Sequence, residues 1–150
     1  MARQRSIHDK PVVYRRAVAV GELKLSPAGR RAVRLGRVEK GDPLRAGELA
    51  GLLAIKRTHE LIPHCHPIPI TGSSVDLEAS SQGVRARAEV EALWRTGVEM
   101  EALVGVSVAL LTAWDMVKYL EKDQRGGYPS TQIRSVRVLR KVKRPAPKAP

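Results

Sequence analysis

The sequence contains no phenylalanine and no asparagine, and aromatic residues make up only 3% of its 150 residues. The core must therefore be built from Leu, Val, Ile and Ala rather than from packed rings. A single cysteine, Cys65, excludes an internal disulfide and is typical of a reducing compartment, so we expect a cytoplasmic protein. Arg outnumbers Lys by 18 to 9, a bias that suits a protein from a hot environment, although GC-rich coding produces a similar bias.

Long apolar runs and the common nucleotide-binding loops are also missing. The longest stretch free of charge, His and Pro covers 13 residues, 102–114, whereas a membrane span needs about 20. The N-terminus is charged and no apolar signal core follows it. Neither G-x-x-x-x-G-K-[S/T] nor G-x-G-x-x-G occurs. We therefore expect a soluble protein, without a membrane partner, in which residues 102–114 form a buried helix.

Basic residues clearly outnumber acidic residues in this chain. The chain has 27 Lys and Arg against 15 Asp and Glu, a formal net charge of +12. Such a balance favours anionic partners such as nucleic acid, an acidic membrane surface or a polyphosphate. We expect residues 1–143 to form one domain, and the Pro-, Lys- and Ala-rich residues 144–150 to form a disordered basic tail.

Hydrophobic periodicity gives the order of the elements. Alternation predicts four strands, at residues 12–25, 68–78, 84–94 and 133–142. Helical periodicity with start signals predicts three helices, at residues 27–35 after Ser26, 44–58 after Asp42, and from a Thr96–Glu99 capping box to about residue 122. Setting one helix aside leaves βαββαβ. This predicts an α+β fold, a ferredoxin-like antiparallel sheet with helices on one face and one extra helix.

Two dense polar clusters interrupt the apolar sequence. In the second cluster, Asp115 and Lys118 are three residues apart on the predicted helix and so share a face. Partial burial there would shift the pKa of the carboxylate or the ammonium toward neutrality and suit proton transfer. The alternative is an ordinary surface ion pair. Glu99 and Glu101 stand on the first turn of the same helix, where Glu99 also fits a purely structural capping role with Thr96.

The first cluster contains His64, Cys65 and His66 in a proline-bounded segment. We expect this segment to be extended, so that both imidazoles point the same way. A metal site needs a third or fourth ligand at fitting spacing, and none accompanies them. We therefore expect no metal site here, and favour hydrogen bonding between these side chains and a polar substrate.

Five cationic residues stand on different predicted elements or connections: Arg15, Lys40, Lys56, Lys118 and Lys141. Several lysines converging on one point would form a polyphosphate site, since each ammonium acts as a point charge on phosphate. Scattered, solvated lysines are the alternative, and sequence does not distinguish the two.

Together these clusters resemble the MoaC family of molybdenum cofactor biosynthesis, the cyclic pyranopterin monophosphate synthases. The resemblance extends from about residue 9 to residue 141. The matching segments are Lys40-Gly41-Asp42, Ala54-Ile55-Lys56-Arg57-Thr58, Glu60-Leu61-Ile62-Pro63, Cys65-His66-Pro67, Thr96-Gly97-Val98-Glu99-Met100-Glu101-Ala102-Leu103 and Trp114-Asp115-Met116-Val117-Lys118.

The resemblance implies a lyase that converts a cyclised guanosine triphosphate, 3′,8-cyclo-7,8-dihydro-GTP, to cyclic pyranopterin monophosphate and pyrophosphate. It implies a homo-hexamer, a trimer of dimers with sites at subunit interfaces, and no bound metal or organic cofactor; whether magnesium accompanies the triphosphate stays open. By the same resemblance the catalytic residues are Asp115, Lys118 and Lys40, and the substrate contacts are Arg15, Lys56, His64, Cys65, His66, Glu99, Met100, Glu101 and Lys141.

The chain departs from the family pattern at three places. His64 stands where many relatives have Leu, the segment 124–132 is longer than usual, and Val142-Lys143-Arg144-Pro145 replaces a glycine-rich ending that carries a lysine. The competing hypothesis is a small nucleic-acid-binding module, which the net charge favours. The scarcity of aromatic residues for base stacking and the absence of a recognised motif argue against it, so we expect no nucleic-acid partner. A catalytically inactive scaffold is disfavoured because nearly all acid, base and lysine positions are occupied.

Overall fold

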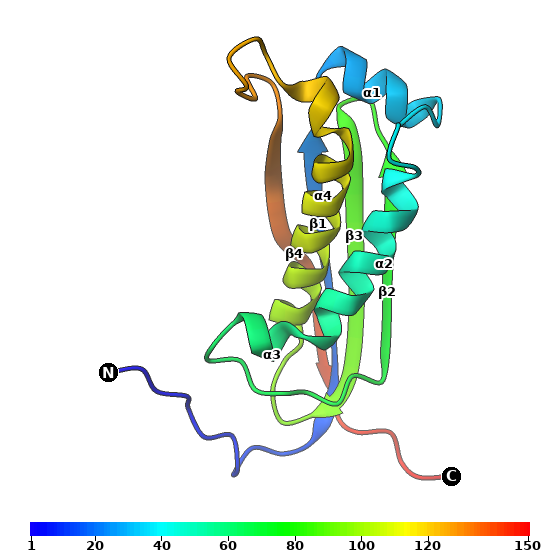
Figure 1. The fold of residues 1–150 in the computed structure, drawn as a ribbon. Helices are drawn as coiled ribbons and strands as arrows, with labels where there is room; N and C mark the ends of the chain where they lie inside the picture. The colour runs from blue at the N-terminus through cyan, green and yellow to red at the C-terminus, as the bar shows by residue number, and fades with distance from the viewer.

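A four-stranded antiparallel sheet with helices on one face forms the body of the protein (Figure 1). The computed structural model describes all 150 residues. The elements are β1 (Val13–Lys24), α1 (Pro27–Arg34), α2 (Pro43–Lys56), α3 (Thr58–Leu61), β2 (Gly72–Ala79), β3 (Gly83–Trp94), α4 (Glu99–Glu121) and β4 (Gln132–Arg144). The strands lie in the order β2-β3-β1-β4. This is the order of a ferredoxin-like sheet, so the predicted α+β fold is confirmed, with α1 as the extra helix at one end of the sheet.

Local sequence signals explain where the first two helices begin. The Ser26 hydroxyl accepts a hydrogen bond from the Gly29 amide, and the Asp42 carboxylate accepts from the amides of Leu44 and Arg45. Each cap is followed by proline at the first helical position, where the missing amide hydrogen costs nothing. Both predicted N-caps are confirmed.

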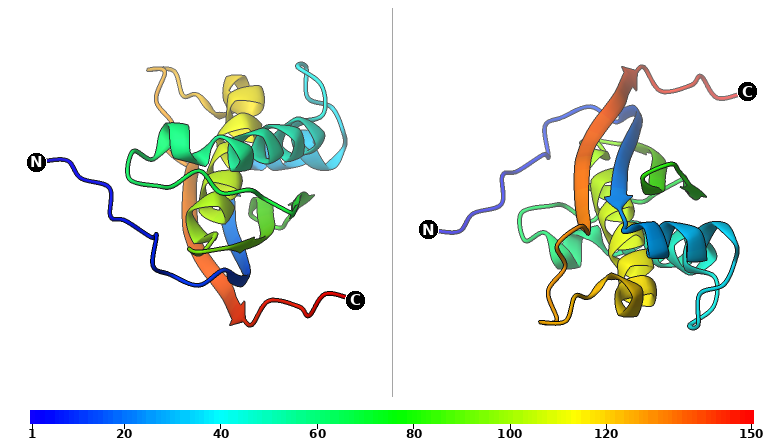
Figure 2. Two further views of the ribbon diagram at one scale, coloured as in Figure 1. Left: turned by 90° about the horizontal axis from the view of Figure 1, so that it is seen from below. Right: turned by 90° about the horizontal axis from the view of Figure 1, so that it is seen from above.

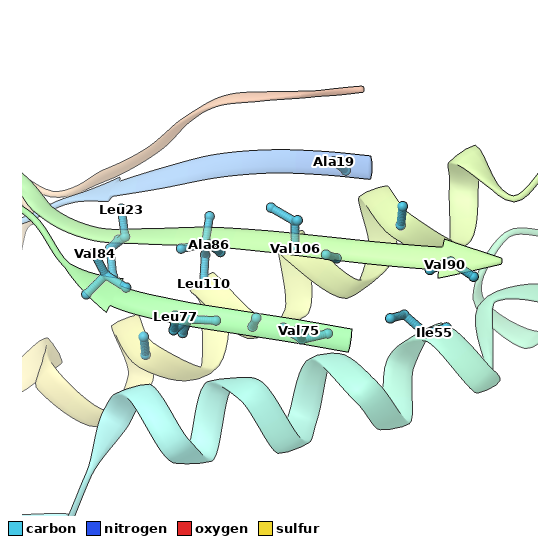
Figure 3. Close-up of a cluster of buried hydrophobic side chains, with 14 of the residues drawn as sticks. Ala19, Leu23, Ile55, Val75, Leu77, Val84, Ala86, Val90, Val106 and Leu110 are labelled. Atoms are coloured by element: carbon cyan, nitrogen blue, oxygen red, sulfur yellow. The ribbon is translucent and has the colours of Figure 1, made fainter. Parts of the chain in front are cut away.

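The core lies between the sheet and the helices α2 and α4 (Figure 3). Alternate residues of β1, β2 and β3 point inward, and their side chains are mostly Val, Leu and Ala, as expected for a protein without Phe. Small residues let the helices approach closely. A Cβ at Gly51 of α2 would lie 2.8 Å from the carbonyl oxygen of Gly105 in α4, and one at Gly47 would lie 2.9 Å from that of Ala109. The two helix backbones are therefore in direct contact.

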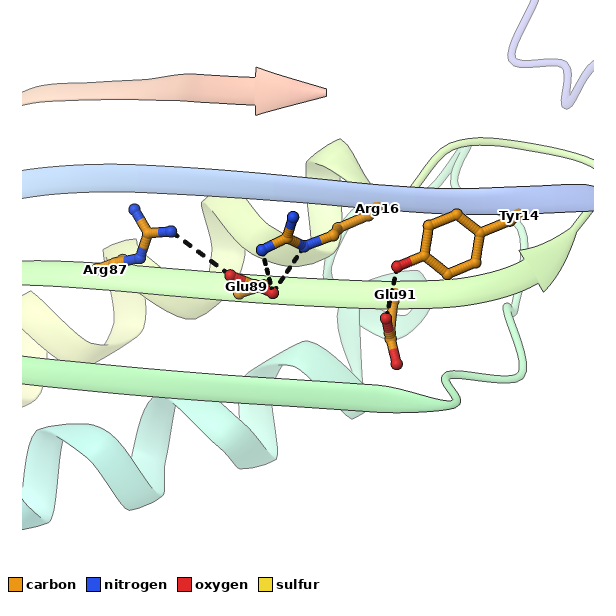
Figure 4. Close-up of polar contacts among 5 residues, drawn as sticks. All are labelled: Tyr14, Arg16, Arg87, Glu89 and Glu91. Carbon is orange, nitrogen blue, oxygen red and sulfur yellow. Dashed lines mark hydrogen bonds and ion pairs between the residues drawn. The ribbon is translucent and has the colours of Figure 1, made fainter. Parts of the chain in front are cut away.

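No helix covers the other face of the sheet, in agreement with the prediction of helices on one face only (Figure 2). This face is polar. Arg16 of β1 pairs with Glu89 of β3 at 2.6 Å, and the Tyr14 hydroxyl donates a hydrogen bond of 2.6 Å to Glu91 (Figure 4). Such cross-strand pairs hold β1 and β3 in register on the open face.

Four boundaries differ from the predictions. β2 begins at Gly72 rather than at residue 68, because Pro67 and Pro69 have no amide hydrogen for a ladder. α3 was not predicted; it follows a break where the buried Thr58 hydroxyl turns back to the carbonyl oxygens of Ala54 and Ile55. β4 is longer than predicted and ends at Arg144, and residues 145–150 form no helix or strand.

The fourth difference concerns the start of α4. Val98 is the N-cap residue and no side chain caps this end, so the predicted Thr96–Glu99 capping box is wrong. The carboxylate of Glu99 instead pairs with Lys141 of β4. A tertiary ion pair has replaced a local hydrogen bond that the spacing allowed.

By length and composition alone, α4 could cross a membrane. In this fold it is the central core helix: its buried residues pack against β1, β3 and α2. The prediction of a buried helix at residues 102–114 is confirmed for the inner side of α4.

Candidate active site in two halves

The first group of predicted site residues lies near the C-terminal end of α4. The Lys118 ammonium lies 2.6 Å from Oδ1 of Asp115. The Lys40 ammonium, from the connection between α1 and α2, lies 3.3 Å from Oδ2 and 3.2 Å from the carbonyl oxygen of Asp115. We call Asp115, Lys118 and Lys40 the charged half-site. Two ammonium groups from distant parts of the chain therefore converge on one carboxylate.

Both ionisable groups of the central pair are held in their charged forms. Hydrogen bonds from Lys118 and then Lys40, with the charges of both, lower the pKa of Asp115 below its usual value. The hydrogen bond to Asp115 and its charge raise the pKa of Lys118. The predicted shift toward neutrality is therefore wrong for this chain, because the Asp115 side chain is more than half exposed and meets two cations. This half-site offers a charged triad to an anionic ligand.

The second group lines a cleft of about 430 Å³ around the N-terminal end of α4. Its walls come from the segment after α3, the turn before α4, the first turn of α4, and β4. The lining residues are His64, Cys65, His66, Ile68, Thr96, Gly97, Glu99, Met100, Glu101 and Val138. We call this the cleft half-site. Six of the nine predicted substrate contacts line it.

Glu101 is the group in the cleft half-site whose pKa lies near neutrality. Its side chain lines the cleft although the residue is only 4% exposed. Burial, with a smaller contribution from the charge of Glu99, raises the pKa of Glu101 to about 7. Burial and the charge of Glu101 also raise the pKa of the Cys65 thiol. At neutral pH the cleft therefore holds a carboxyl group that can either donate or accept a proton, beside a protonated thiol.

Glu99, two residues earlier on the same first turn, has a different environment. Burial alone would raise its pKa, but the hydrogen bond from Lys141, its own backbone amide, and the charges of Lys141 and Arg15 outweigh burial, so the pKa of Glu99 lies below its ordinary value. Arg15 is 8% exposed on the inner face of β1, and its Nε has no hydrogen-bond partner in the chain. Arg15 and Lys141 thus bring positive charge to the edge of the cleft, with an unused buried donor on Arg15.

The histidine segment is not extended, contrary to the prediction. A turn, closed by a hydrogen bond of 2.9 Å from the Cys65 amide to the Ile62 carbonyl, precedes His66. His64 and His66 nevertheless both line the cleft. Gln4, which the sequence did not single out, donates a hydrogen bond of 3.0 Å to the Cys65 carbonyl and so ties the N-terminal segment to this turn.

Lys56 is the predicted contact that lies apart from the others. It stands at the end of α2 and lines a separate pocket of about 370 Å³ with Ile70, Thr71 and residues at the start of β2. The two pockets share Ile68 as a wall. Lys56 is therefore a neighbour of the cleft half-site rather than a member of it.

The two half-sites lie at opposite ends of one helix. Glu101 and Asp115 are 14 residues apart on α4, which is about 21 Å along the helix axis. Between them α4 presents an outward stripe in which Val104, Ser107 and Val108 are half-buried and Leu111 is exposed. Within a single chain, the residues of each half-site lie close together, but the two half-sites lie far from each other.

Comparison with known proteins identifies the family. Residues 4–143 match the MoaC family. The chain belongs to the MoaC family. It is 51% identical over 137 residues to a protein of Pyrococcus furiosus named probable cyclic pyranopterin monophosphate synthase, covering 91% of this chain and 88% of that one. It is 54% identical over 142 residues to a protein of the same name from Methanosarcina acetivorans, covering 95% and 90% of the two chains.

The family motifs divide between the two half-sites. The MoaC-type segments at Lys40 and at Asp115 to Lys118 form the charged half-site. Those at His66 and at Glu99 to Glu101 line the cleft half-site. No group of three His, Cys, Asp or Glu side chains lies close enough to hold a metal ion. Tyr128, in the segment before β4, meets edge-on at 5.4 Å the ring of Trp114, which directly precedes Asp115 in sequence.

Proposed function

We propose that this MoaC-family enzyme converts the cyclised guanosine triphosphate to cyclic pyranopterin monophosphate and pyrophosphate at sites that two subunits share. Family membership and the name of relatives that are about half identical support the activity. The observation that carries the shared site is the separation of the half-sites. A charged triad and a cleft with a near-neutral carboxyl group occupy opposite ends of α4.

The outward stripe of α4 suggests how two copies meet. The midpoint between Glu101 and Asp115 falls at Val108. If a second copy packs its α4 antiparallel on this stripe, with a two-fold axis near that midpoint, Asp115 of each copy faces Glu101 of the other. The exposed Leu111 and Met100 would be covered in the process. Such a dimer has two equivalent sites, and three dimers would form the hexamer.

The cleft half-site suits rearrangement of the purine-derived bicycle. That step requires protons to leave some ring atoms and to arrive at others, and a group whose pKa is near the working pH transfers protons most efficiently. Glu101 has such a pKa. In the proposal Asp115 is the second acid–base group, and Lys118 holds its carboxylate and takes part in proton transfer. His64, His66 and Met100 contact the substrate from the cleft walls.

Pyrophosphate release needs positive charge. A sugar hydroxyl loses its proton to a base, its oxygen attacks the α-phosphorus, and the bond from that phosphorus to the bridging oxygen of the β-phosphate breaks. Negative charge then grows on the leaving pyrophosphate. Lys40 from one subunit and Lys141 from the other neutralise it, with Arg15 and Lys56 nearby. The reaction uses no resident cofactor and takes place in the cytoplasm.

Mixing two inactive variants tests the shared site. Asp115→Asn and Glu101→Gln each damage a different half-site. In a mixed dimer one of the two sites receives both damaged halves and the other receives neither. Random reassociation should therefore restore about a quarter of the wild-type pyrophosphate release. Each variant alone should stay inactive.

The matched control mixes Asp115→Asn with Lys118→Ala. Both changes affect the same half-site, so every shared site keeps one damaged residue and no activity should return. Recovery in this control, or no recovery in the first mixture when size-exclusion chromatography shows reassociated oligomers, contradicts a site shared between Asp115 and Glu101 of different subunits.

A further inference from the structure

The loop that carries Lys40 is fastened to α4 by a tyrosine. Tyr119 lies on α4 directly after Lys118, and its hydroxyl oxygen accepts a hydrogen bond of 2.9 Å from the backbone amide of Glu39. Glu39 immediately precedes Lys40. The bond joins positions 80 residues apart in sequence, so it fixes the connection between α1 and α2 onto the same helix that carries Asp115.

A turn hydrogen bond of 3.1 Å from the Gly41 amide to the Val38 carbonyl closes the loop locally, and little else holds this part of it to α4. Its backbone bends at Gly36 and Gly41, which have φ angles of +63° and +107°, a conformation that costs other residues free energy. Val38 is buried and anchors the middle of the loop. After Val38 in sequence, the loop backbone has one hydrogen bond with a side chain of α4, the bond to the Tyr119 hydroxyl.

Lys40 depends on this attachment because its own contacts are weak. Its ammonium lies 3.2 Å from the backbone carbonyl oxygen of Asp115 and 3.3 Å from the carboxylate Oδ2, whereas that of Lys118 lies 2.6 Å from Oδ1. Its side chain is about half exposed, and an exposed lysine keeps many rotamers. The position of its backbone therefore decides how often the ammonium reaches the half-site.

We propose that Tyr119 is a positioning residue for Lys40: by accepting the Glu39 amide, its hydroxyl holds the Lys40 ammonium at Asp115 and at the triphosphate. This inference rests on the proposed function of Lys40. Tyr119 and Asp115 are four residues apart on α4 and so lie on one side of the helix. The helix thus supplies both the carboxylate and the attachment point for the cation that pairs with it.

The test removes only the hydroxyl. Tyr119→Phe should keep the ring packing and lower kcat/KM for pyrophosphate release about 3- to 10-fold, the range expected for one net hydrogen bond. Hydrogen exchange at the Glu39 amide should become faster in the same variant. The matched control is Tyr14→Phe. It removes a tyrosine hydroxyl that hydrogen-bonds Glu91 on the open face of the sheet (Figure 4), and should leave kcat/KM unchanged.

A double-mutant cycle separates positioning from a general structural role. If Tyr119 acts through Lys40, Tyr119→Phe should have no further effect on kcat/KM once Lys40→Ala is present. Full additivity of the two changes overturns the inference, as does wild-type kcat/KM in Tyr119→Phe while Lys40→Ala is impaired; the proposed function survives both results. Wild-type kcat/KM in Lys40→Ala overturns the role of Lys40 itself, and the inference with it.

Discussion

The two ends of α4 carry carboxyl groups with opposite behaviour. Near the C-terminal end, Asp115 is exposed, meets two ammonium groups and has a lowered pKa. Near the N-terminal end, Glu101 is buried, has no cation beside it, and has a pKa of about 7. The helix backbone is the same in both places. Solvent access and neighbouring charge, rather than residue type, decide which group stays ionised and which one exchanges protons at neutral pH.

The largest effect is expected at the charged end. Asp115→Asn keeps the side-chain shape and removes the charge that gathers both ammonium groups, so pyrophosphate release should fall about 10²- to 10⁴-fold. A coupled pyrophosphate assay measures the loss, and size-exclusion chromatography checks that the variant elutes as the wild-type protein does. Asp76→Asn, at an exposed position on the open face of the sheet, is the control. Near-normal turnover in Asp115→Asn would remove this residue from the mechanism.

At the N-terminal end of α4, the raised pKa of Glu101 predicts that stability depends on pH. The pKa of Glu101 is raised from 4.5 to about 7 in the folded protein. The unfolded chain therefore loses this proton at lower pH than the folded one, and stability falls as pH rises through this interval. Relative to Glu101→Gln, the wild-type protein should lose about 2–3 kcal/mol of unfolding free energy between pH 5 and pH 8. Urea unfolding at several pH values measures this, and a constant difference between the two proteins would contradict the raised pKa.

Lys40→Ala tests whether the charged end meets a polyanion. Substrate binding should weaken about 10-fold at low salt, and the defect should shrink as salt rises because ions screen the exposed charge. KM and the pyrophosphate inhibition constant, each measured at low and high salt, report this directly. A defect that does not change with salt points to a folding role for Lys40.

The smallest effect is expected for the thiol beside Glu101. Burial raises the pKa of Cys65, so the thiol is protonated at neutral pH and does not act as a nucleophile. Cys65→Ser should therefore change kcat/KM by less than about threefold. Trapping with iodoacetamide offers a second readout, since a protonated thiol reacts slowly. A loss comparable to that of Asp115→Asn would show that the thiol takes part in the chemistry.

Much of the fold could be predicted because its signals are local. Alternation identified the strands, and Ser26 and Asp42 fixed the starts of two helices. The errors arose where distant residues compete with local ones. Glu99 has the spacing for a capping box with Thr96, yet it pairs with Lys141, which is 42 positions later in sequence.

The candidate site could be predicted only in part, because its geometry also depends on contacts between distant residues. Sequence identified Asp115 and Lys118 as neighbours on one helical face, but it could not show that Lys40 joins them or that this end is exposed. It named Glu101 without indicating its burial, which raises its pKa. Tyr119 and Gln4 act through a backbone amide and a backbone carbonyl, contacts that no side-chain motif encodes.

The glycine-mediated contact between α2 and α4 has a consequence for how this enzyme can evolve. Because the two backbones are in contact at Gly51 and Gly47, α4 has little room to move against α2, and the number of residues between its two ends sets the distance between them. One residue added within residues 102–114 would turn everything beyond it by about 100° and carry Asp115 away from the Glu101 that the proposed dimer places opposite it. Length changes should therefore be tolerated in the surface loops and rejected inside this helix.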